Sequence, residues 1–214
     1  MSRTEFYRSV RPMFGGAMSQ KQVDGIEALL AATEGLPITH RAYLMATAAH
    51  ETDQTMHPIA EYGKGKGKPY GKPGRHGQAQ YGRGYVQLTW DDNYERADEA
   101  LGLNGALLKD FNLAMQPTIA ANILVRGCSE GWFTSKKLSD YLPGDYRGAR
   151  RVVNGTDKAD LIAGYSREFE AALRLLPDAP LTPKPVDDKT PAQTVAKPSF
   201  IARLIAWLFK GRKA

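Results

Sequence analysis

The pattern of hydrophobic and polar positions predicts a mainly helical body. Ser19, followed three residues later by Gln22, forms a capping box, which marks the start of a helix. Gly35 and Pro37 then end this helix. Its apolar side chains recur at helical spacing and are expected on one face: Val23, Ile26, Leu29 and Leu30. A second helix is expected to begin near Thr39 and to run through HRAYLMATAAHE.

Two further helices are predicted in the second half of the body. Pro117 suits the first turn of a helix that continues through TIAANILVR. Thr156 or Asp157 is expected to cap a long final helix. The side chains that should face inward from this final helix are Leu161, Ile162, Tyr165, Phe169, Leu173 and Leu176.

Residues 62–89 show no helical period. They are rich in glycine and lysine and then alternate through YVQLT, as a loop that leads into a short strand would. No acidic residue lies between Tyr62 and Trp90. The basic residues there are Lys64, Lys66, Lys68, Lys72, Arg75 and Arg83. The segment is either a solvated loop or a flexible wall that attracts an anionic polymer.

A proline-rich linker separates the body, residues 1–176, from a short tail. Residues 177–198 contain six of the thirteen prolines in the chain, and such a segment favours an extended, semi-rigid conformation without a core. The tail, residues 199–214, has an apolar run of about ten residues, which is roughly half a bilayer crossing. An amphipathic helix lying in a membrane interface fits this length, and a helix docked on the body is the alternative. The residues expected to contact a membrane are Phe200, Ile201, Arg203, Leu204, Ile205, Trp207, Leu208, Lys210, Arg212 and Lys213.

Composition and charge narrow the class of protein. A hydrophobic content of 42% with 24% charged residues is typical of a globular chain and not of a disordered one. The single cysteine, Cys128, excludes an intrachain disulfide, and the N-terminal segment lacks the apolar core of a secretory signal. We therefore expect folding in a reducing compartment. Four of the six net positive charges lie in the tail and the linker is balanced, so the body holds only two and nucleic-acid binding is not expected.

Two common catalytic motifs are excluded by their spacing. His50 and Glu51 would begin a zinc-protease motif, but the second histidine one turn later is missing because position 54 is Gln54. The segment GKGKGKPYGK lacks the glycine spacing and the Ser or Thr of a phosphate-binding loop. No metal or organic cofactor is expected.

The pair Glu51 and Glu61 is the strongest candidate for chemistry. Glu51 ends an apolar helical run, where burial would raise its pKa and keep it protonated. Glu61 lies beside the lysine-rich segment, where positive charge would keep it ionised. Glycoside hydrolysis needs one carboxyl group of each kind, although two glutamates ten residues apart also occur in many proteins without a catalytic role.

Three motifs add a resemblance to a known family. AHETDQTMHPIAEYG, then YGRGYVQLTWDDNY, then RRVVNG resemble the catalytic core of glycoside hydrolase family 19 over roughly residues 40–176. That family contains plant-type chitinases and many bacteriophage endolysins. The resemblance implies a mainly α, α+β lysozyme-like fold with a small β-hairpin and loop region.

The resemblance also implies roles for particular residues. Glu51 matches the general acid, Glu61 the general base that activates water, and Thr89 stands where the chitinases usually have a serine that positions this water. Amides and hydroxyls suit sugar binding because they both donate and accept hydrogen bonds. The substrate-binding residues implied in this way are Gln87, Asn93, Asn154, Tyr81 and His50.

The short segment between the two glutamates and the lack of disulfides resemble the phage lysins of the family more than the plant chitinases. We therefore expect a monomeric, inverting endolysin of the muramidase type that cleaves the β-1,4 bonds of peptidoglycan and binds no nucleic acid. It would accumulate in the host cytoplasm and reach the wall through a separate holin-type protein, and its tail would bind anionic membrane or lipopolysaccharide. A chitinase, or a membrane-active antimicrobial protein whose tail is the functional part, are the alternatives.

Overall fold

The computed structural model describes residues 2–176. The predicted linker and cationic tail, residues 177–214, lie outside the described residues. The helical elements of the described part are α1 (Arg3–Val10), η1 (Arg11–Phe14), α2 (Gln20–Ala32), α3 (Ile38–Glu51), η2 (Pro69–Gly71), α4 (Asp91–Leu101), α5 (Ala106–Lys109), η3 (Phe111–Met115), α6 (Pro117–Glu130), η4 (Leu138–Asp140), α7 (Tyr146–Ala149), η5 (Arg150–Val152) and α8 (Ala159–Leu173). Two short strands, β1 (Ile59–Ala60) and β2 (Arg83–Gly84), pair antiparallel, with Ile59 opposite Gly84.

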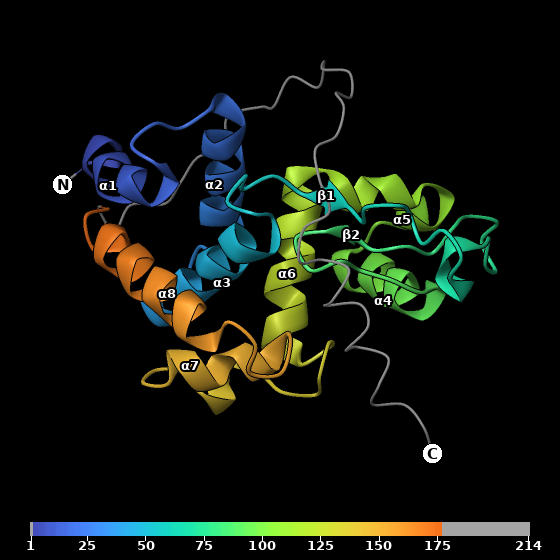
Figure 1. Cartoon of the computed structure of the whole chain (residues 1–214). Helices are drawn as coiled ribbons and strands as arrows, with labels where there is room; N and C mark the ends of the chain where they lie inside the picture. The colour runs from blue at the N-terminus through green and yellow to red at the C-terminus, as the bar shows by residue number, and fades with distance from the viewer. Residues whose placement is uncertain (1, 177–214) are drawn as a thin grey trace.

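Helix α3 is the centre of the molecule. Its residues 42–49 are all buried, because the run AYLMATAA presents small or apolar side chains on every side of the helix. It packs most extensively against α8, which also contacts α1 and α7. In Figure 1 the strands and α4 and α5 lie together on one side of the molecule, whereas α1, α2, α7 and α8 lie on the other, with α6 between them. The mainly helical fold class is confirmed, and no helix among residues 2–176 is long and apolar enough to cross a membrane.

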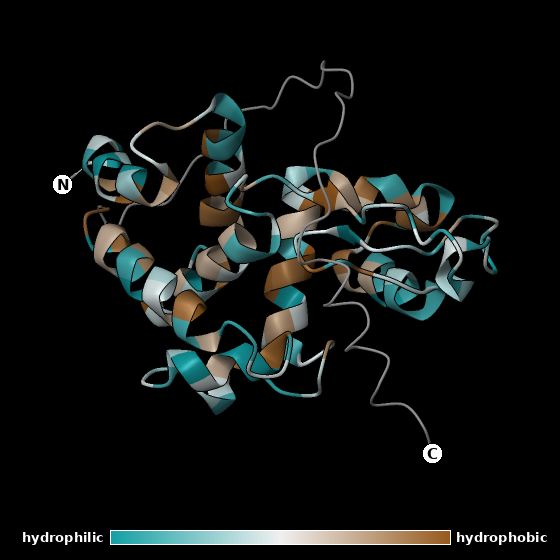
Figure 2. Ribbon diagram, in the orientation of Figure 1, coloured by the Kyte–Doolittle hydropathy of each residue, from teal (hydrophilic) through white to brown (hydrophobic). Residues whose placement is uncertain are grey.

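The sequence predicted the starts of α2, α3 and α6 correctly. Ser19 and Gln22 form both hydrogen bonds of the capping box, and Pro117 occupies the first turn of α6. Figure 2 shows many hydrophobic residues on α2 and α6. Helices α1 and α4 were not predicted.

The start and one face of α8 differ from the prediction. Its N-cap is Lys158, because Thr156 closes a turn with Ala159 and the Asp157 carbonyl accepts a hydrogen bond from Arg150. Leu161 is 43% exposed and not on the inward face, whereas Ile162, Phe169 and Leu173 are buried as predicted, together with small residues. The small residues are Ala159, Ala163, Ser166 and Ala172.

The predicted strand through YVQLT is also wrong. Arg83 and Leu88 exchange backbone hydrogen bonds of 3.2 and 2.8 Å, so residues 84–87 form a tight turn. Gln87 adopts a left-handed φ of 55° within this turn. Only Arg83–Gly84 remains as strand β2. All residues of YVQLT are buried, so the alternation of apolar and polar residues does not mark a buried and an exposed face.

Candidate active site

Glu51 lies at the last residue of α3 and is almost completely buried, with 3% of its surface exposed. The five residues after Glu51 turn the chain toward β1, and three of them have positive φ: Asp53, Gln54 and Met56. Thr52 holds this sharp turn, because its hydroxyl donates to the Ala48 carbonyl and accepts from the Met56 amide. The end of α3 therefore places Glu51 in a fixed position inside the protein.

Arg150 is the ion-pair partner of Glu51. Its Nη1 atom lies 2.6 Å from Glu51 Oε1, and both side chains are buried. Burial raises the pKa of Glu51, and the neighbouring Arg150 partly opposes this rise. The expected burial and raised pKa of Glu51 are confirmed, and a carboxyl group that keeps its proton can act as a general acid.

Glu61 follows β1 directly and is 8% exposed. Tyr70 Oη donates to its Oε1 atom at 3.1 Å, and the Gly82 amide donates to its Oε2 atom at 3.3 Å. These two hydrogen bonds and the charge of Lys68 favour the ionised form, but burial is the larger effect and the pKa of Glu61 is raised. The sequence suggested that positive charge would keep Glu61 at an ordinary pKa, and this prediction is wrong. Lys68 does lower the pKa of Glu61, but burial raises it by more.

Gln87 and Thr89 lie beside Glu61, around Gly82. A Cβ atom on Gly82 would stand 2.8 Å from Gln87 Oε1 and 3.3 Å from Thr89 Oγ1, so only glycine fits between them. Gln87 Nε2 donates to the Ile59 and Gly84 carbonyls, while its buried Oε1 atom has no partner among the described residues. Thr89 Oγ1 donates to the Gln87 carbonyl at 2.8 Å, and the hydroxyl oxygen keeps acceptor capacity for a water molecule.

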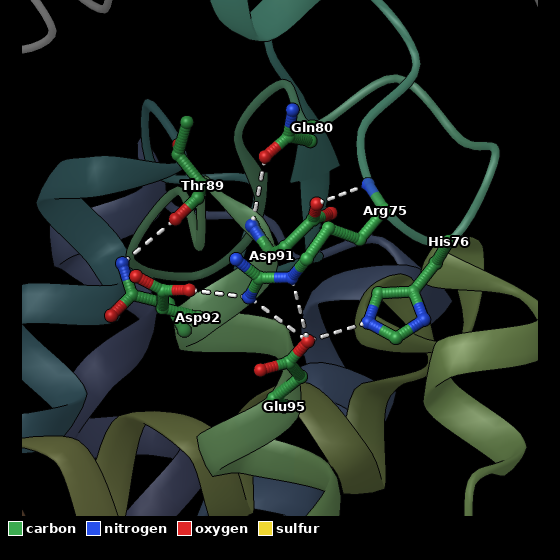
Figure 3. A network of polar contacts seen from close by, with 8 residues as sticks. Arg75, His76, Gln80, Thr89, Asp91, Asp92 and Glu95 are labelled. Carbon is green, nitrogen blue, oxygen red and sulfur yellow. Dashed lines mark hydrogen bonds and ion pairs between the residues drawn. The ribbon is translucent and has the colours of Figure 1, made fainter.

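Asn93 completes this side of the site. Its Nδ2 atom donates to the Thr89 carbonyl at 2.7 Å, so the amide fixes the backbone that carries the Thr89 hydroxyl. Figure 3 shows Thr89 with the polar network at the start of α4, in which Gln80 accepts from the Asp91 amide. The structure therefore groups Glu61, Gln87, Thr89 and Asn93, all of which the sequence named.

Asn154 and His50 belong to the Glu51 side. The backbone N–H of Asn154 donates to the Arg150 carbonyl at 2.9 Å, and Asn154 is buried. Burial and the charge of Arg150 lower the pKa of His50 to about 4, so its imidazole is neutral at pH 7. A neutral imidazole offers both a donor and an acceptor to a polar ligand.

Tyr81 is placed differently from the other predicted substrate-binding residues. The Cζ atom of Arg83 lies 3.6 Å from the centroid of the Tyr81 ring, so the guanidinium covers the ring. Tyr81 is buried and packs with Tyr70 in a small separate cluster. This cation–π contact supports the hairpin that carries Gln87. The structure thus shows Tyr81 in a packing position.

A buried hydrogen bond from Tyr85 helps to join the two sides of the site, in addition to the pairing of β1 with β2. Tyr85, at the tip of the tight turn, donates from its hydroxyl to the Met56 carbonyl at 3.0 Å, and both residues are buried. This bond pins the hairpin with Gln87 to the segment that connects Glu51 with Glu61. Glu51 and Glu61 make no hydrogen bond to each other within residues 2–176, so each has its own partners.

Sequence reasoning missed Arg150, Tyr70 and the exposed Tyr62. Arg150 lies in RRVVNG, the motif that suggested Asn154, and this membership was an available signal. Tyr70 carried no signal, because only the fold brings it to Glu61. Tyr62 is 59% exposed directly beside Glu61, and an exposed aromatic ring offers an apolar face to a sugar. No group of three or more potential metal ligands occurs in the described part of the chain.

Comparisons with known proteins identify relatives among the chitinases. No family model matches the chain. Endochitinase B of Zea mays is 24% identical over 199 residues, which cover 83% of this chain and 68% of the relative. An endochitinase of Arabidopsis thaliana is 36% identical over 84 residues, which cover 39% of this chain and 27% of the relative.

Solved structures show the same fold. Chitinase C from Streptomyces griseus superposes with a TM-score of 0.57 at 22% identity, over 82% of this chain and 77% of that one. A bacterial family 19 chitinase gives a TM-score of 0.51 at 21% identity, over 80% of this chain and 94% of that one. The chitinase relatives and the solved structures together identify the chain as a glycoside hydrolase with the chitinase-like fold of family 19.

Proposed function

We propose that the chain cleaves the β-1,4 bonds of a glycan built on N-acetylglucosamine, with inversion at the anomeric carbon. The observation that supports this most strongly is the pair of buried carboxyl groups with different partners. Glu51 lies against Arg150 inside the protein, whereas Glu61 accepts hydrogen bonds from Tyr70 and Gly82 beside the hydroxyl of Thr89. One group suits proton donation and the other suits activation of water.

In the proposed mechanism, Glu51 gives its proton to the glycosidic oxygen as the bond to the anomeric carbon breaks. Glu61 takes a proton from a water molecule, and the resulting hydroxide equivalent attacks the opposite face of the sugar. Thr89 holds this water through its hydroxyl oxygen. Gln87 Oε1, Asn154 and His50 supply polar groups for the hydroxyls and the N-acetyl group of the sugar.

Chitin is the first candidate polymer, because the relatives are named endochitinases. Peptidoglycan, expected from the sequence, is the second candidate, since the exposed lysines of residues 64–72 offer partners to carboxylates that chitin lacks. The finer proposal is a phage endolysin whose tail, residues 199–214, binds anionic membrane. It rests on the motifs and on the composition of that tail.

Mass spectrometry of digestion products tests the proposed function. Purified chitin oligomers and purified peptidoglycan are incubated with the full chain, and we expect fragments ending in a reducing N-acetylated sugar from at least one of them. Cleavage of chitin oligomers alone would support the chitinase, and muropeptides with a reducing N-acetylmuramic end would support a muramidase. Products ending in a 1,6-anhydro sugar, or no glycan cleavage at all, would contradict hydrolysis with Glu61 as the base.

A change at Tyr70 should alter the pH dependence of activity. Tyr70→Phe removes a hydrogen bond to the Glu61 carboxylate, so the already raised pKa of Glu61 should rise further. Because a general base must be ionised, the acidic limb of the kcat/KM profile should move to higher pH, while the basic limb, set by Glu51, should stay.

The matched control is Tyr7→Phe. Tyr7 also donates to a glutamate, Glu27, but lies on α1 away from both carboxyl groups of the site. This variant should leave both limbs in place. An unchanged acidic limb in Tyr70→Phe would argue against Glu61 as the base.

A further inference from the structure

Four lysines in residues 64–72 have no evident structural task. Lys64, Lys66, Lys68 and Lys72 are all exposed, and none forms a salt bridge within residues 2–176. The other two basic residues of this acid-free segment are used inside the fold. Arg75 pairs with Asp92 and Glu95, and Arg83 is buried against Tyr81 and Tyr94.

The segment that carries these lysines is a succession of turns and not the flexible wall considered from the sequence. Backbone hydrogen bonds run from the Lys64 amide to Glu61, from Lys66 to Gly63 and from Lys68 to Gly65, at 2.8–3.0 Å. Three glycines, at 63, 65 and 67, adopt φ between 68° and 82°, which favours glycine over other residues. The alternation of glycine and lysine therefore closes the turns with the glycines and leaves the lysine side chains in solvent.

Both ends of this lysine segment are fixed. At its start, the Lys64 amide donates to the Glu61 carbonyl at 3.0 Å. Inside the segment, Tyr70 is buried, donates to Glu61 and packs edge-on against Trp90 at 5.6 Å between ring centroids. Within the segment, Gly65 and Gly71 are in backbone contact so close that neither admits a Cβ atom. At the other end, the Arg75 amide donates to Asp91 at 2.6 Å, and the Arg75 side chain joins the network of Figure 3.

The lysine segment lies beside the proposed base. The charge of Lys68 acts on Glu61, and the turns begin at the Glu61 carbonyl. Along the chain, Tyr62 lies between Glu61 and Lys64, the first lysine of the segment. Its ring is exposed, so a sugar could rest against it. Positive charge is thus presented next to the site where the glycan must bind, and not at a distance from it.

We propose that Lys64, Lys66, Lys68 and Lys72 form a subsite for carboxylates carried on the glycan, so that a peptide-substituted glycan of the peptidoglycan type is cleaved in preference to neutral chitin. This inference rests on the proposed function, cleavage of β-1,4 bonds at Glu51 and Glu61. Chitin is neutral and gives four unpaired ammonium groups nothing to bind. In peptidoglycan, alternate sugars bear a lactyl-linked peptide with free carboxylates, which would lie along the lysine turns when the glycan occupies the site. Ammonium groups on flexible stems suit such a target, because the peptide carboxylates vary in position.

The test compares a soluble tetrasaccharide from peptidoglycan that bears its stem peptides with the neutral tetrasaccharide of N-acetylglucosamine. Peptidoglycan stripped of its peptides is not a suitable comparator, because removing a stem peptide leaves the lactyl carboxylate. The triple variant Lys64→Gln, Lys66→Gln, Lys72→Gln leaves Lys68 beside Glu61 and keeps every glycine of the turns. We expect the ratio of kcat/KM on the peptide-bearing tetrasaccharide to that on the neutral one to fall about tenfold, since each exposed ion pair contributes modestly. The loss should appear in KM, and added salt should reduce the ratio of the native chain in the same way.

A charge-matched control is Lys21→Gln, Lys109→Gln, Lys136→Gln, which removes three exposed lysines outside this segment. It should leave the ratio unchanged, and melting curves of both triple variants should match that of the native chain. An equal ratio in the native chain and the lysine-segment variant, or an equal fall in the control, would overturn the subsite. Failure of the native chain to cleave either tetrasaccharide would refute the proposed function itself, which is a different outcome.

Discussion

Replacing Glu51 with glutamine should reduce glycan cleavage by at least two to four orders of magnitude. Glutamine has nearly the same shape and can still accept the hydrogen bond from Arg150 Nη1, but it has no proton to transfer. General acid catalysis alone is worth roughly 10²–10⁴-fold, and the buried position leaves no nearby solvent path for a substitute acid. The loss should appear in kcat, because the sugar-binding groups remain in place.

The measurement is the initial rate of cleavage of a soluble oligosaccharide, together with a thermal unfolding curve. Glu168→Gln is the matched control, since Glu168 is exposed on α8, far along the chain from the site. The control should keep the native rate. A folded Glu51→Gln protein with more than about a tenth of the native rate would show that Glu51 is not the general acid. If the protein instead acted only on membranes, Glu51→Gln would leave its activity on cells unchanged.

The second large effect is expected for Glu61→Gln, with a loss of roughly 10²–10⁴-fold in kcat. The variant keeps an acceptor for Tyr70 Oη but cannot remove a proton from water. Thr89 does not substitute, because its hydroxyl is neutral near pH 7 and already donates to the Gln87 carbonyl. The same rate assay and unfolding curve apply.

The two glutamine variants should differ in one respect that separates their roles. A substrate with a good leaving group needs little help from an acid, so it should restore much of the rate of Glu51→Gln but little of that of Glu61→Gln. An aryl glycoside of a chitin oligomer serves as this substrate. Equal rescue of both variants would mean that the assigned roles are wrong.

The sequence predicted the helices whose signals are local. Ser19 and Gln22 lie three residues apart, and Pro117 acts on its own turn, so no distant contact is needed to interpret them. YVQLT misled because alternation also arises in a buried tight turn, where Arg83 pairs with Leu88 and the intervening residues reverse direction. The exposure of Leu161 depends on where α8 begins, and that start is displaced by the contact of Arg150 with Asp157.

The candidate site was predictable where the motifs name its residues and not where the fold assembles them. Glu51, Glu61, Gln87, Thr89 and Asn93 all follow from the family resemblance, and the structure places the last four around Gly82. The pairing of Glu51 with Arg150 spans 99 residues of sequence, and the bond from Tyr70 to Glu61 depends on the glycine-rich turns between them. The raised pKa of Glu61 could not be predicted, since it depends on burial that outweighs Lys68.

The anomeric form of the first product tests the central claim most directly. Proton NMR is recorded during the first minutes of cleavage of a β-linked N-acetylglucosamine oligomer, before the new reducing end equilibrates. Attack by a water that Glu61 activates on the face opposite to the bond that Glu51 protonates predicts the α-anomer as the initial product. Initial formation of the β-anomer would show retention through a covalent or substrate-assisted intermediate, and would contradict the assignment of Glu61 as the base.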